Sequence, residues 1–450
     1  MRPVRRGFLQ WPLFRVYGAF FLYQRWSRRR FTLSGYAVLS ATVLCAALGV
    51  DTRHTLAFEA FAFLSALLLV AWVLGLRRPP PLGLAIEAPR WAEAGMPFNL
   101  ALRLENSAEH GQEGLQIRLE MPDPRPDFES FCQSRDPRRI NAYDRALGFY
   151  RYAHLLHEKR NADHVTVPLP PLPPKGSLHT NLEVTPYRRG TLQLSGASVL
   201  RPDPMGLVRA ARFLASPARI LVLPRRYHLP RVLLPGRHRD THGELLPNAR
   251  AGDSDEFLSL RDYRPGDPLP RIHWKRYARL GRPVVREYQE EAAPRYVLLL
   301  DNCVPPDAAA AFEEAISIAA SFACTLESGE CLLDLLLADG SSGASSAAAP
   351  SAHAYSPDLL LGTLASIQAS GVNGLAPLKH AADQLREPQA GVIAILLAWD
   401  AGRRALVAAL QASGAHVTIL LVASQRPSDL PADAHHLVPG RIEEGLARLR

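Results

Sequence analysis

The sequence predicts three structural parts: a membrane helical hairpin, a β-sandwich, and an α/β domain with a doubly wound, mostly parallel sheet. Three observations predict this organisation. Two long apolar segments, 33–50 and 55–76, lie near the N-terminus. Short runs that alternate apolar and polar residues fill 82–224, as half-buried antiparallel strands do. Continuous apolar runs alternate with helical patterns over 295–450, as in a parallel sheet covered by helices on both faces.

The two apolar segments are each long enough to cross a membrane. Residues 33–50 carry no charge and residues 55–76 carry only Glu59. At 1.5 Å per residue, both can span a hydrocarbon core of about 30 Å. Only residues 51–54 separate them, so the chain turns at one surface and returns. The alternatives are a buried core hairpin, or a cleaved signal peptide formed by the first segment.

The arginines near these segments predict the orientation. Residues 28–30 precede the first segment and residues 77–78 follow the second, and all five are arginine. Cytoplasmic flanks of membrane helices are enriched in Lys and Arg. We therefore expect a multi-pass protein of the inner (cytoplasmic) membrane, partnered by the lipid bilayer, with both termini and the soluble domains in the cytoplasm. Residues 1–30 form a basic cytoplasmic or interfacial segment within this scheme, ahead of the membrane hairpin at 31–78.

The net charge does not favour nucleic acid as a partner. The formal charge is +9, and residues 1–30 alone hold eight arginines and no acid. Beyond residue 78 the basic and acidic residues are equal in number. A groove for phosphate backbones requires a basic surface, which a neutral soluble part does not predict. The five cysteines are scattered without metal-ligand spacing, so we expect reduced thiols.

The predicted β-sandwich, 82–224, has one long interruption. Its expected strands lie at 82–88, 98–106, 114–121, 164–169, 179–186, 190–200 and 219–224. Residues 122–163 are rich in Pro, Arg and Asp, with a helix expected within Ala142–Lys159. Such a long insertion is either a functional flap or a mobile loop. Its aromatic residues Phe149, Tyr150 and Tyr152 could contact lipid headgroups, a partner, or nothing.

A linker with a charged motif, 225–291, joins the sandwich to the α/β domain at 295–450. Its part 252–291 holds eight basic and eight acidic residues with interleaved aromatics. Balanced charge with planar arginines favours a network of bidentate ion pairs and stacking, which would lock the two domains together. A docking surface for a partner, or a site for an anionic ligand, is the alternative. Residues 264–267 predict a tight turn in which Gly266 takes a positive φ.

The order of residues in this motif resembles a known family. EF-x-x-LR-x-Y-x-x-GD-x-x-x-RIHW-K-x-x-AR, followed by V-RE and an apolar strand ending in Asp, resembles a bacterial family called domain of unknown function number fifty-eight. The RPDPMGLVRA segment at 201–210 is also similar to that family. The signature positions are Glu256, Phe257, Leu260, Arg261, Tyr263, Gly266, Asp267, Arg271, Ile272, Trp274, Ala278, Arg279 and Glu287.

The resemblance implies more than the residues show. It implies a C-terminal domain like the von Willebrand factor type A domain, and no established enzymatic activity. Genes of this family commonly lie beside genes for MoxR-type AAA+ ATPases and for membrane proteins with a transglutaminase-like domain. Both kinds of protein are therefore implied as partners.

Two aspartates are the candidates for a metal site. Asp301 and Asp400 each end an apolar run, so they are expected at the carboxyl edge of the sheet, where ligands of α/β folds bind. A type A metal site would use Asp-x-Ser-x-Ser, whose oxygens suit Mg²⁺. This chain has Cys303 and Pro305 at the two serine positions, so the site is degenerate. No cofactor is expected, and Mg²⁺ is the alternative.

The sequence thus leaves two functional hypotheses. The favoured one is a non-enzymatic, membrane-tethered adaptor that binds protein partners through its α/β domain and charged motif. The other is a metal-dependent hydrolase or transferase that uses the Asp301/Asp400 edge. Walker A, H-E-x-x-H and G-x-S-x-G motifs are missing from the sequence, and no catalytic or cofactor-binding residue is assigned. His273, the lone histidine of the motif, is expected to be structural.

Overall fold

The structure is a computed structural model that describes most of the chain. The described residues are 10–48, 56–77, 79–134, 141, 143, 147–163, 165–229, 257–264, 267, 269–288, 295–304, 308–326, 332–337, 357–369 and 391–449. The chain divides into two compact units, Met1–Arg225 and Arg226–Arg450. Each unit is described by itself.

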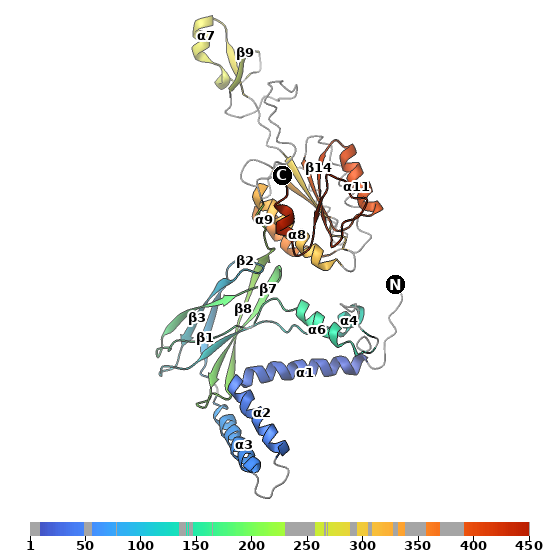
Figure 1. The fold of residues 1–450 in the computed structure, drawn as a ribbon. Coiled ribbons are helices and arrows are strands. Elements are labelled where there is room, and N and C mark those ends of the chain that lie inside the picture. Colours follow the sequence, from blue (N-terminus) through green and yellow to red (C-terminus); the bar gives the residue numbers. More distant parts are fainter. Residues whose placement is uncertain are drawn as a thin grey trace. The chain divides into compact units, whose positions relative to one another are not determined.

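The first unit begins with three helices. They are α1 (Gln10–Arg30), α2 (Leu33–Leu48) and α3 (Leu56–Leu74). α2 and α3 pack side by side (Figure 1). Of the described helices, only α3 is long and apolar enough to cross a membrane, and α2 is apolar but shorter. Their large apolar side chains are mostly exposed, for example Leu33 at 89%, Leu56 at 84% and Phe63 at 68%.

Two sheets enclose one apolar core behind these helices. The three-stranded antiparallel sheet has the order β1 (Leu82–Glu87), β3 (Phe98–Asn106), β6 (Ser177–Val184). The second has the order β2 (Trp91–Glu93), β8 (Arg209–Leu223), β7 (Gly190–Pro202), β4 (Gln116–Glu120), β5 (Thr166–Pro168). Alternate residues point inward, as the period of two requires: Leu100 and Leu102 of β3 meet Ile117 of β4 and Ile220 of β8 in the core.

The turn between β7 and β8 attaches the sandwich to the helices. It lies in the 201–210 segment, and β8 starts at Arg209, ten residues earlier than the expected strand at 219–224. Asp203 closes the turn by accepting from the backbone N–H groups of Met205 (3.0 Å) and Val208 (2.6 Å). Leu207 and Val208 then pack with Ala71 of α3. The helices and the sandwich therefore form one packed unit.

The start of α2 fits closely against this turn. The Thr32 N–H donates to Leu207 O (3.1 Å), and the Ser34 hydroxyl donates to Gly206 O (2.8 Å). A Cβ atom on Gly35 would lie 2.1 Å from Leu207 O. Only glycine allows this approach of helix to turn.

The 122–163 insertion packs on α1. It contains α4 (Phe128–Gln133) and α6 (Phe149–Glu158). Phe131 and Tyr152 form an aromatic cluster with Phe14 and Tyr17 of α1, at centroid separations of 5.5 to 6.4 Å. Aromatic pairs at such distances stabilise beyond the area that they bury. Two of the three insertion aromatics noted in the sequence therefore contact α1: Tyr152, and Phe149, which lies 5.6 Å from Tyr17.

The second unit contains a five-stranded parallel sheet, as its alternating strand and helix patterns predicted. The strand order is β12 (Leu332–Leu337), β11 (Arg295–Leu300), β13 (Gly391–Leu396), β14 (His416–Val422), β15 (His435–Leu437). The helices that the structure describes next to this sheet are α8 (Ala309–Leu326), α9 (Pro357–Ser366), α11 (Ala401–Ala412) and α12 (Ile442–Leu446). α8 and α9 lie on one side of the sheet and α11 on the other (Figure 1). The chain is thus of mixed α/β class with several sheets.

The charged motif forms a small element of its own, here called the 257–288 module. It contains β9 (Phe257–Asp262), the 3₁₀ helix η1 (Leu269–Arg271), α7 (Trp274–Leu280) and β10 (Val284–Tyr288). β9 and β10 pair as antiparallel strands. The sequence pattern predicted a linker with a motif over this stretch and gave no indication of its strands.

Some expectations lie outside the described residues. They are the 51–54 turn, Cys331, and the motif or site residues Glu256, Gly266 and Pro305. The four described cysteines, Cys45, Cys132, Cys303 and Cys324, are free thiols.

Candidate functional site

The two candidate aspartates meet at the carboxyl edge of the parallel sheet. Asp301 directly follows β11, and Asp400 follows β13 and caps the N-terminus of α11. β12 lies on one side of β11 and β13 on the other, so the chain reverses its winding direction between β11 and β13. Ligands of open α/β sheets bind at such a switch point. Both aspartates therefore lie at the sheet edge that their positions in the sequence predicted.

Arg403 of α11 lies between the two carboxylates. Its Nε donates to Asp301 Oδ2 (2.6 Å) and its Nη1 donates to Asp400 Oδ2 (2.5 Å). Its Nη2 donates to Cys303 O (2.7 Å). Asp301 and Arg403 are 0% and 4% exposed, while half of the Asp400 side chain is exposed. One buried guanidinium thus links β11, β13 and α11.

The remaining acceptor capacity of Asp301 is also used. Its Oδ1 accepts from the Cys303 N–H (3.0 Å), and its Oδ2 accepts from the Leu397 N–H (3.1 Å). A buried carboxylate with two backbone donors and one guanidinium donor is well compensated. The network fixes the loops after both strands.

The pKa values of this network move in the direction that favours both charges. Burial lowers the pKa of Arg403, but the hydrogen bond and charge of Asp301, together with Asp400, outweigh it, and the pKa is raised overall. Burial raises the pKa of Asp400, but hydrogen bonds from the Arg403 and Gly402 N–H groups and the Arg403 charge outweigh it, and the pKa is lowered. Both groups are ionised at neutral pH.

This arrangement does not fit Mg²⁺. A magnesium ion requires near-octahedral oxygen ligands, whereas both carboxylates point at a permanently positive group. Asn302 Oδ1 is a buried acceptor without a partner among the described residues, but one neutral oxygen does not make a ligand set. In the described part of the chain, no three acidic, His or Cys side chains are grouped as metal ligands. Arg403 therefore supplies the positive charge that the sequence pattern suggested for a metal.

A bidentate ion pair organises the 257–288 module. Arg261 Nη1 and Nη2 donate to the two carboxylate oxygens of Asp267 at 2.7 and 2.8 Å. Asp267 also accepts from the Arg264 N–H (2.8 Å) and donates its own N–H to Arg264 O (3.1 Å), which closes the predicted tight turn. The hydrogen bond from Arg261, followed by that from the Arg264 N–H, lowers the pKa of Asp267 to about 2.

The outer face of the module carries exposed aromatic and basic side chains. Trp274 is 60% exposed, Tyr277 40% and Leu280 48%. The two rings stack edge to face at 5.9 Å. Lys275, Arg276 and Arg279 are exposed on the same helix, which contains no acid. Exposed large aromatic side chains are characteristic of interaction surfaces. The described part of the chain leaves both of these rings exposed.

The signature residues have distinct places in the module. Arg261 and Asp267 form its internal ion pair, and Tyr263 is half-buried and donates its N–H to Pro283 O (3.0 Å). Ile272 is buried, whereas Trp274 and Arg279 are exposed. Phe257, Arg271 and Glu287 lie in β9, η1 and β10, with side chains outside the description. His273 caps α7, accepting from the Arg276 N–H at Nδ1 (3.2 Å), which is the expected structural role.

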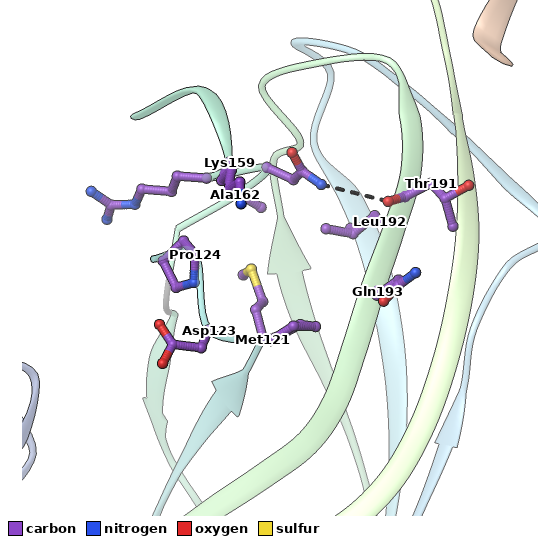
Figure 2. A pocket seen from close by; sticks show the side chains of 11 residues that line it. Met121, Asp123, Pro124, Lys159, Ala162, Thr191, Leu192 and Gln193 are labelled. Atoms are coloured by element: carbon purple, nitrogen blue, oxygen red, sulfur yellow. Dashed lines mark hydrogen bonds between the residues drawn. The ribbon is translucent and has the colours of Figure 1, made fainter. Parts of the chain in front are cut away.

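The first unit contains a shallow pocket of about 310 Å³ (Figure 2). Met121–Pro124 and Lys159–Ala162, the two ends of the insertion, line it with residues of β7. The Asn161 side chain donates to Thr191 O across it (3.5 Å). Its charged groups have partners elsewhere: Asp123 pairs with Arg125, Lys159 with Asp127, and Arg160 with Asp163. The pocket therefore lies where the insertion leaves the sandwich and returns to it.

Arg403 is the site residue that sequence reasoning missed. It lies three residues after Asp400, in the first turn of a helix that follows an apolar strand. A cation at a helix N-terminus opposes the helix dipole, so its presence there indicates a specific anionic partner. That signal could have identified Arg403, although it could not have identified Asp301 as the partner.

The comparisons with known proteins support the family resemblance over part of the chain. The family described as "Protein of unknown function DUF58" matches residues 259–438, which run from β9 to β15. No curated protein matches the chain. A solved late embryogenesis abundant (LEA) protein is 11% identical, with a TM-score of 0.19, and the match covers 38% of this chain and 95% of that one. A superoxide reductase (neelaredoxin) from Ignicoccus hospitalis is 12% identical, with a TM-score of 0.12, covering 30% and 79%. Similarities at these TM-scores carry no argument.

Proposed function

We propose that this chain is a membrane-tethered adaptor, which presents the 257–288 module to a protein partner from the cytoplasmic surface of the inner membrane. The observation that carries the proposal is the exposed Trp274/Tyr277 face of α7, on a module braced by its own ion pair. Interface energy concentrates in aromatic and Arg side chains that a partner can cover. A braced surface also binds without a large ordering cost.

The tether rests on α2 and α3. Their exposed apolar side chains cover most of both helices, and of the α3 window that is apolar enough to span a membrane only 6% is buried. Exposing the apolar side chains of two helices to water would be unfavourable. At 19 residues, α3 is about 28 Å long, close to the thickness of the hydrocarbon core. Arginines at 28–30 support an orientation with the soluble parts in the cytoplasm.

The partner that we propose is a MoxR-type AAA+ ATPase. The support is the match of residues 259–438 to the DUF58 family, together with the gene neighbourhoods that this resemblance implies. The basic residues of α7 fit an acidic surface on such a partner, because complementary charge accelerates and orients association. A transglutaminase-like membrane protein is the second partner that the resemblance implies.

A binding measurement on the full chain tests the docking surface. A purified MoxR-type ATPase from the same organism is titrated onto the detergent-solubilised protein by biolayer interferometry. Trp274→Ala should weaken binding at least about tenfold, since buried aromatic anchors contribute about 2 kcal/mol or more. Trp91→Ala is the matched control, because Trp91 is 46% exposed on β2 of the sandwich. Equal losses in the two variants would place the surface elsewhere, and no binding by the unaltered protein would remove this ATPase as the partner.

The tether and its orientation are tested separately. The chain should stay in the membrane fraction after alkaline carbonate extraction. A fluorescent protein fused to the C-terminus should fluoresce, and alkaline phosphatase fused there should be inactive, because only the second requires export. Release by carbonate would contradict the tether, and an active phosphatase would contradict the orientation alone.

A further inference from the structure

The outer face of the β2-β8-β7-β4-β5 sheet in the first unit carries a polar cluster beneath α1. Arg118 and Glu120 lie two residues apart on β4, so both point to the same face, away from Ile117 and Leu119 in the core. Arg118 pairs in register with Ser198 of β7. On β8, Arg209 is placed on this same face through its pairing with Pro202, four residues beyond Ser198. α1 packs across β8 and brings Arg25 and Arg29 to the cluster.

Glu120 is the one acid that the described residues place in this cluster, and both of its carboxylate oxygens accept hydrogen bonds. It is 2% exposed, and its Oε2 accepts from Arg25 Nη2 (3.3 Å) and from Arg29 Nη2. Its Oε1 accepts from the Ser198 hydroxyl (2.9 Å). Among the described residues, Glu120 accepts no hydrogen bond from Arg118 or Arg209.

The charges of the cluster do not balance. Among the described residues, the charges that act on the Arg118 guanidinium are the Glu120 carboxylate and the guanidinium groups of Arg25, Arg29 and Arg209, which leaves an excess of positive charge. Arg118 is only 8% exposed. Burial, followed by the charges of Arg29, Arg25 and Arg209, lowers the pKa of Arg118 against the opposing effect of Glu120. A buried cation without sufficient counter-charge is costly, and native proteins seldom leave one uncompensated.

Three donors of the same arginines lack acceptors. The Nε atoms of Arg29, Arg118 and Arg209 are buried and have no hydrogen-bond partner among the described residues. Buried polar groups are almost always paired, so such a concentration on one face needs an explanation. Gln116 Oε1, on the same face of β4, is a buried acceptor without a partner in the described part of the chain, but a neutral amide oxygen cannot balance the charge. An anion with several oxygens would supply both the charge and the acceptors.

We propose that this cluster of Arg25, Arg29, Arg118 and Arg209 binds a phosphate group, supplied by the headgroup of an anionic phospholipid. Guanidinium forks match phosphate geometry and form strong charge-assisted bonds with it. The opening lies at α1, where the side chains of Arg25 and Arg29 are 18% and 31% exposed.

The surroundings of α1 favour a lipid as the source of the phosphate. The last turn of α1 lies against the apolar helices: the Trp26 ring is 6.2 Å from the Trp72 ring of α3, and the Arg30 guanidinium lies 5.6 Å from the same ring. Trp and Arg at this position suit the headgroup level of a bilayer. The choice of a lipid rests on the proposed membrane tether, whereas the phosphate site itself does not.

Thermal unfolding of the full chain in a neutral detergent tests the site. The probes are inorganic phosphate, phosphatidylglycerol in mixed micelles, and phosphatidylcholine in mixed micelles. Phosphatidylglycerol should raise the melting temperature, because a ligand that binds only the folded state stabilises it. Inorganic phosphate should give a smaller rise, and phosphatidylcholine, whose headgroup has no net charge, should give the smallest. If inorganic phosphate matches phosphatidylglycerol, the phosphate site stands and the lipid source is overturned. If neither probe raises the melting temperature, the whole proposal is overturned.

Substitutions locate the effect. Arg118→Gln should weaken phosphatidylglycerol binding about tenfold, the loss expected for a charge-assisted hydrogen bond. Arg103→Gln is the matched control, because Arg103 lies on β3 of the other sheet with 47% of its side chain exposed. Equal effects of the two variants would overturn the proposal. Arg209→Gln, at a half-buried position, replaces Arg118→Gln if that variant does not fold.

A variant with the opposite expected sign separates a ligand site from a structural cluster. Glu120→Gln removes the acid that the described residues place in the cluster, so the lipid or inorganic phosphate should bind more tightly and restore part of the lost melting temperature. A cluster with no ligand would lose stability in Glu120→Gln without rescue by either probe, which would contradict the site.

Discussion

The guanidinium of Arg403 lies 2.6 Å from Asp301 and 2.5 Å from Asp400, and it joins the two carboxylates at the switch point of the parallel sheet. The edge at which α/β proteins usually bind a ligand is here closed by an internal cation. The chain thereby keeps the two acids that sequence reasoning would assign to a metal, yet uses them to fasten a helix to two strands.

The first prediction concerns the stability of this junction. Arg403→Met should reduce the free energy of unfolding by about 3–5 kcal/mol, because it leaves the buried carboxylate of Asp301 without its counter-charge. The neighbouring Arg404 pairs with Asp429 at the surface, where both side chains are about half exposed. Arg404→Met should therefore cost less than about 1 kcal/mol. Urea unfolding of the purified protein measures both, and equal costs would contradict the account.

The second prediction concerns metal. Adding Mg²⁺ or Mn²⁺ should not change the melting temperature of the unaltered protein, because Arg403 holds both carboxylates. Calorimetric titration of the full chain measures the same point directly. Tight binding of either ion that Asp301→Ala abolishes would restore the hydrolase or transferase hypothesis.

The third prediction concerns pH and the 257–288 module. The pKa of Asp267 is about 2 in the folded protein, below its usual value of 3.8. Between these values the unfolded state binds more protons, so stabilisation by Asp267 is complete above about pH 4 and is lost as the pH falls toward about 2. The protection of the β9 and β10 backbone amides against hydrogen exchange should decrease as the pH is lowered from about 4 to about 2. Asp267→Asn should be less protected at neutral pH and should lack this pH dependence.

A matched substitution controls for the charge of the module. Asp262 pairs with Arg282 at 3.1 Å, but both side chains are about two-thirds exposed. Exposed pairs contribute little, so Asp262→Asn should leave the protection of β9 and β10 almost unchanged at neutral pH. A loss as large as that of Asp267→Asn would show that any acid on the module has this effect.

The fourth prediction concerns the contact between α2 and the β7–β8 turn. Gly35→Ala should destabilise the first unit, because the added Cβ would lie 2.1 Å from Leu207 O and force the helix from the turn. Gly18→Ala in α1 should be neutral or stabilising by up to about 1 kcal/mol, because its nearest neighbour is Tyr152 Oη at 3.9 Å and alanine favours helix. Thermal unfolding in detergent compares the two. A loss of stability is expected for Gly35→Ala alone, and equal losses in the two variants would contradict the close contact.

The fifth prediction concerns the insertion. Phe131 is 1% exposed at the centre of its aromatic cluster, so Phe131→Ala should cost about 3–5 kcal/mol in the free energy of unfolding. Tyr150→Ala should reduce the free energy of unfolding by about 0.5 kcal/mol or less, because Tyr150 is 44% exposed. Protease sensitivity of the insertion should rise in the first variant alone. An insertion that remains equally resistant in both would contradict its packing on α1.

The pattern of apolar and polar residues was sufficient to predict strands in which buried residues follow a regular period. The alternating run 98–106 matches β3 at both ends, and the apolar runs that end at Asp301 and Asp400 contain β11 and β13. A strand with one buried face must alternate, and a strand buried on both faces must be apolar throughout. Pattern failed in the 257–288 module, where an ion pair and a tight turn organise short strands without a large apolar core. It also missed residues 209–218 of β8, where the alternation is interrupted by small residues.

The sequence by itself determined most strands of the sandwich and of the parallel sheet, the equal numbers of basic and acidic residues beyond residue 78, and the place of Asp301 and Asp400 at one sheet edge. Only the tertiary structure shows which residue each polar side chain contacts. Arg403 reaches Asp301 across 102 positions of the chain, and Arg29 reaches Glu120 across 91. Such pairs depend on how strands and helices pack, because a charged side chain in a sequence shows its chemistry but not its partner. The two acids proposed for a metal, and the arginines assigned to membrane orientation, acquired their partners only in the folded chain.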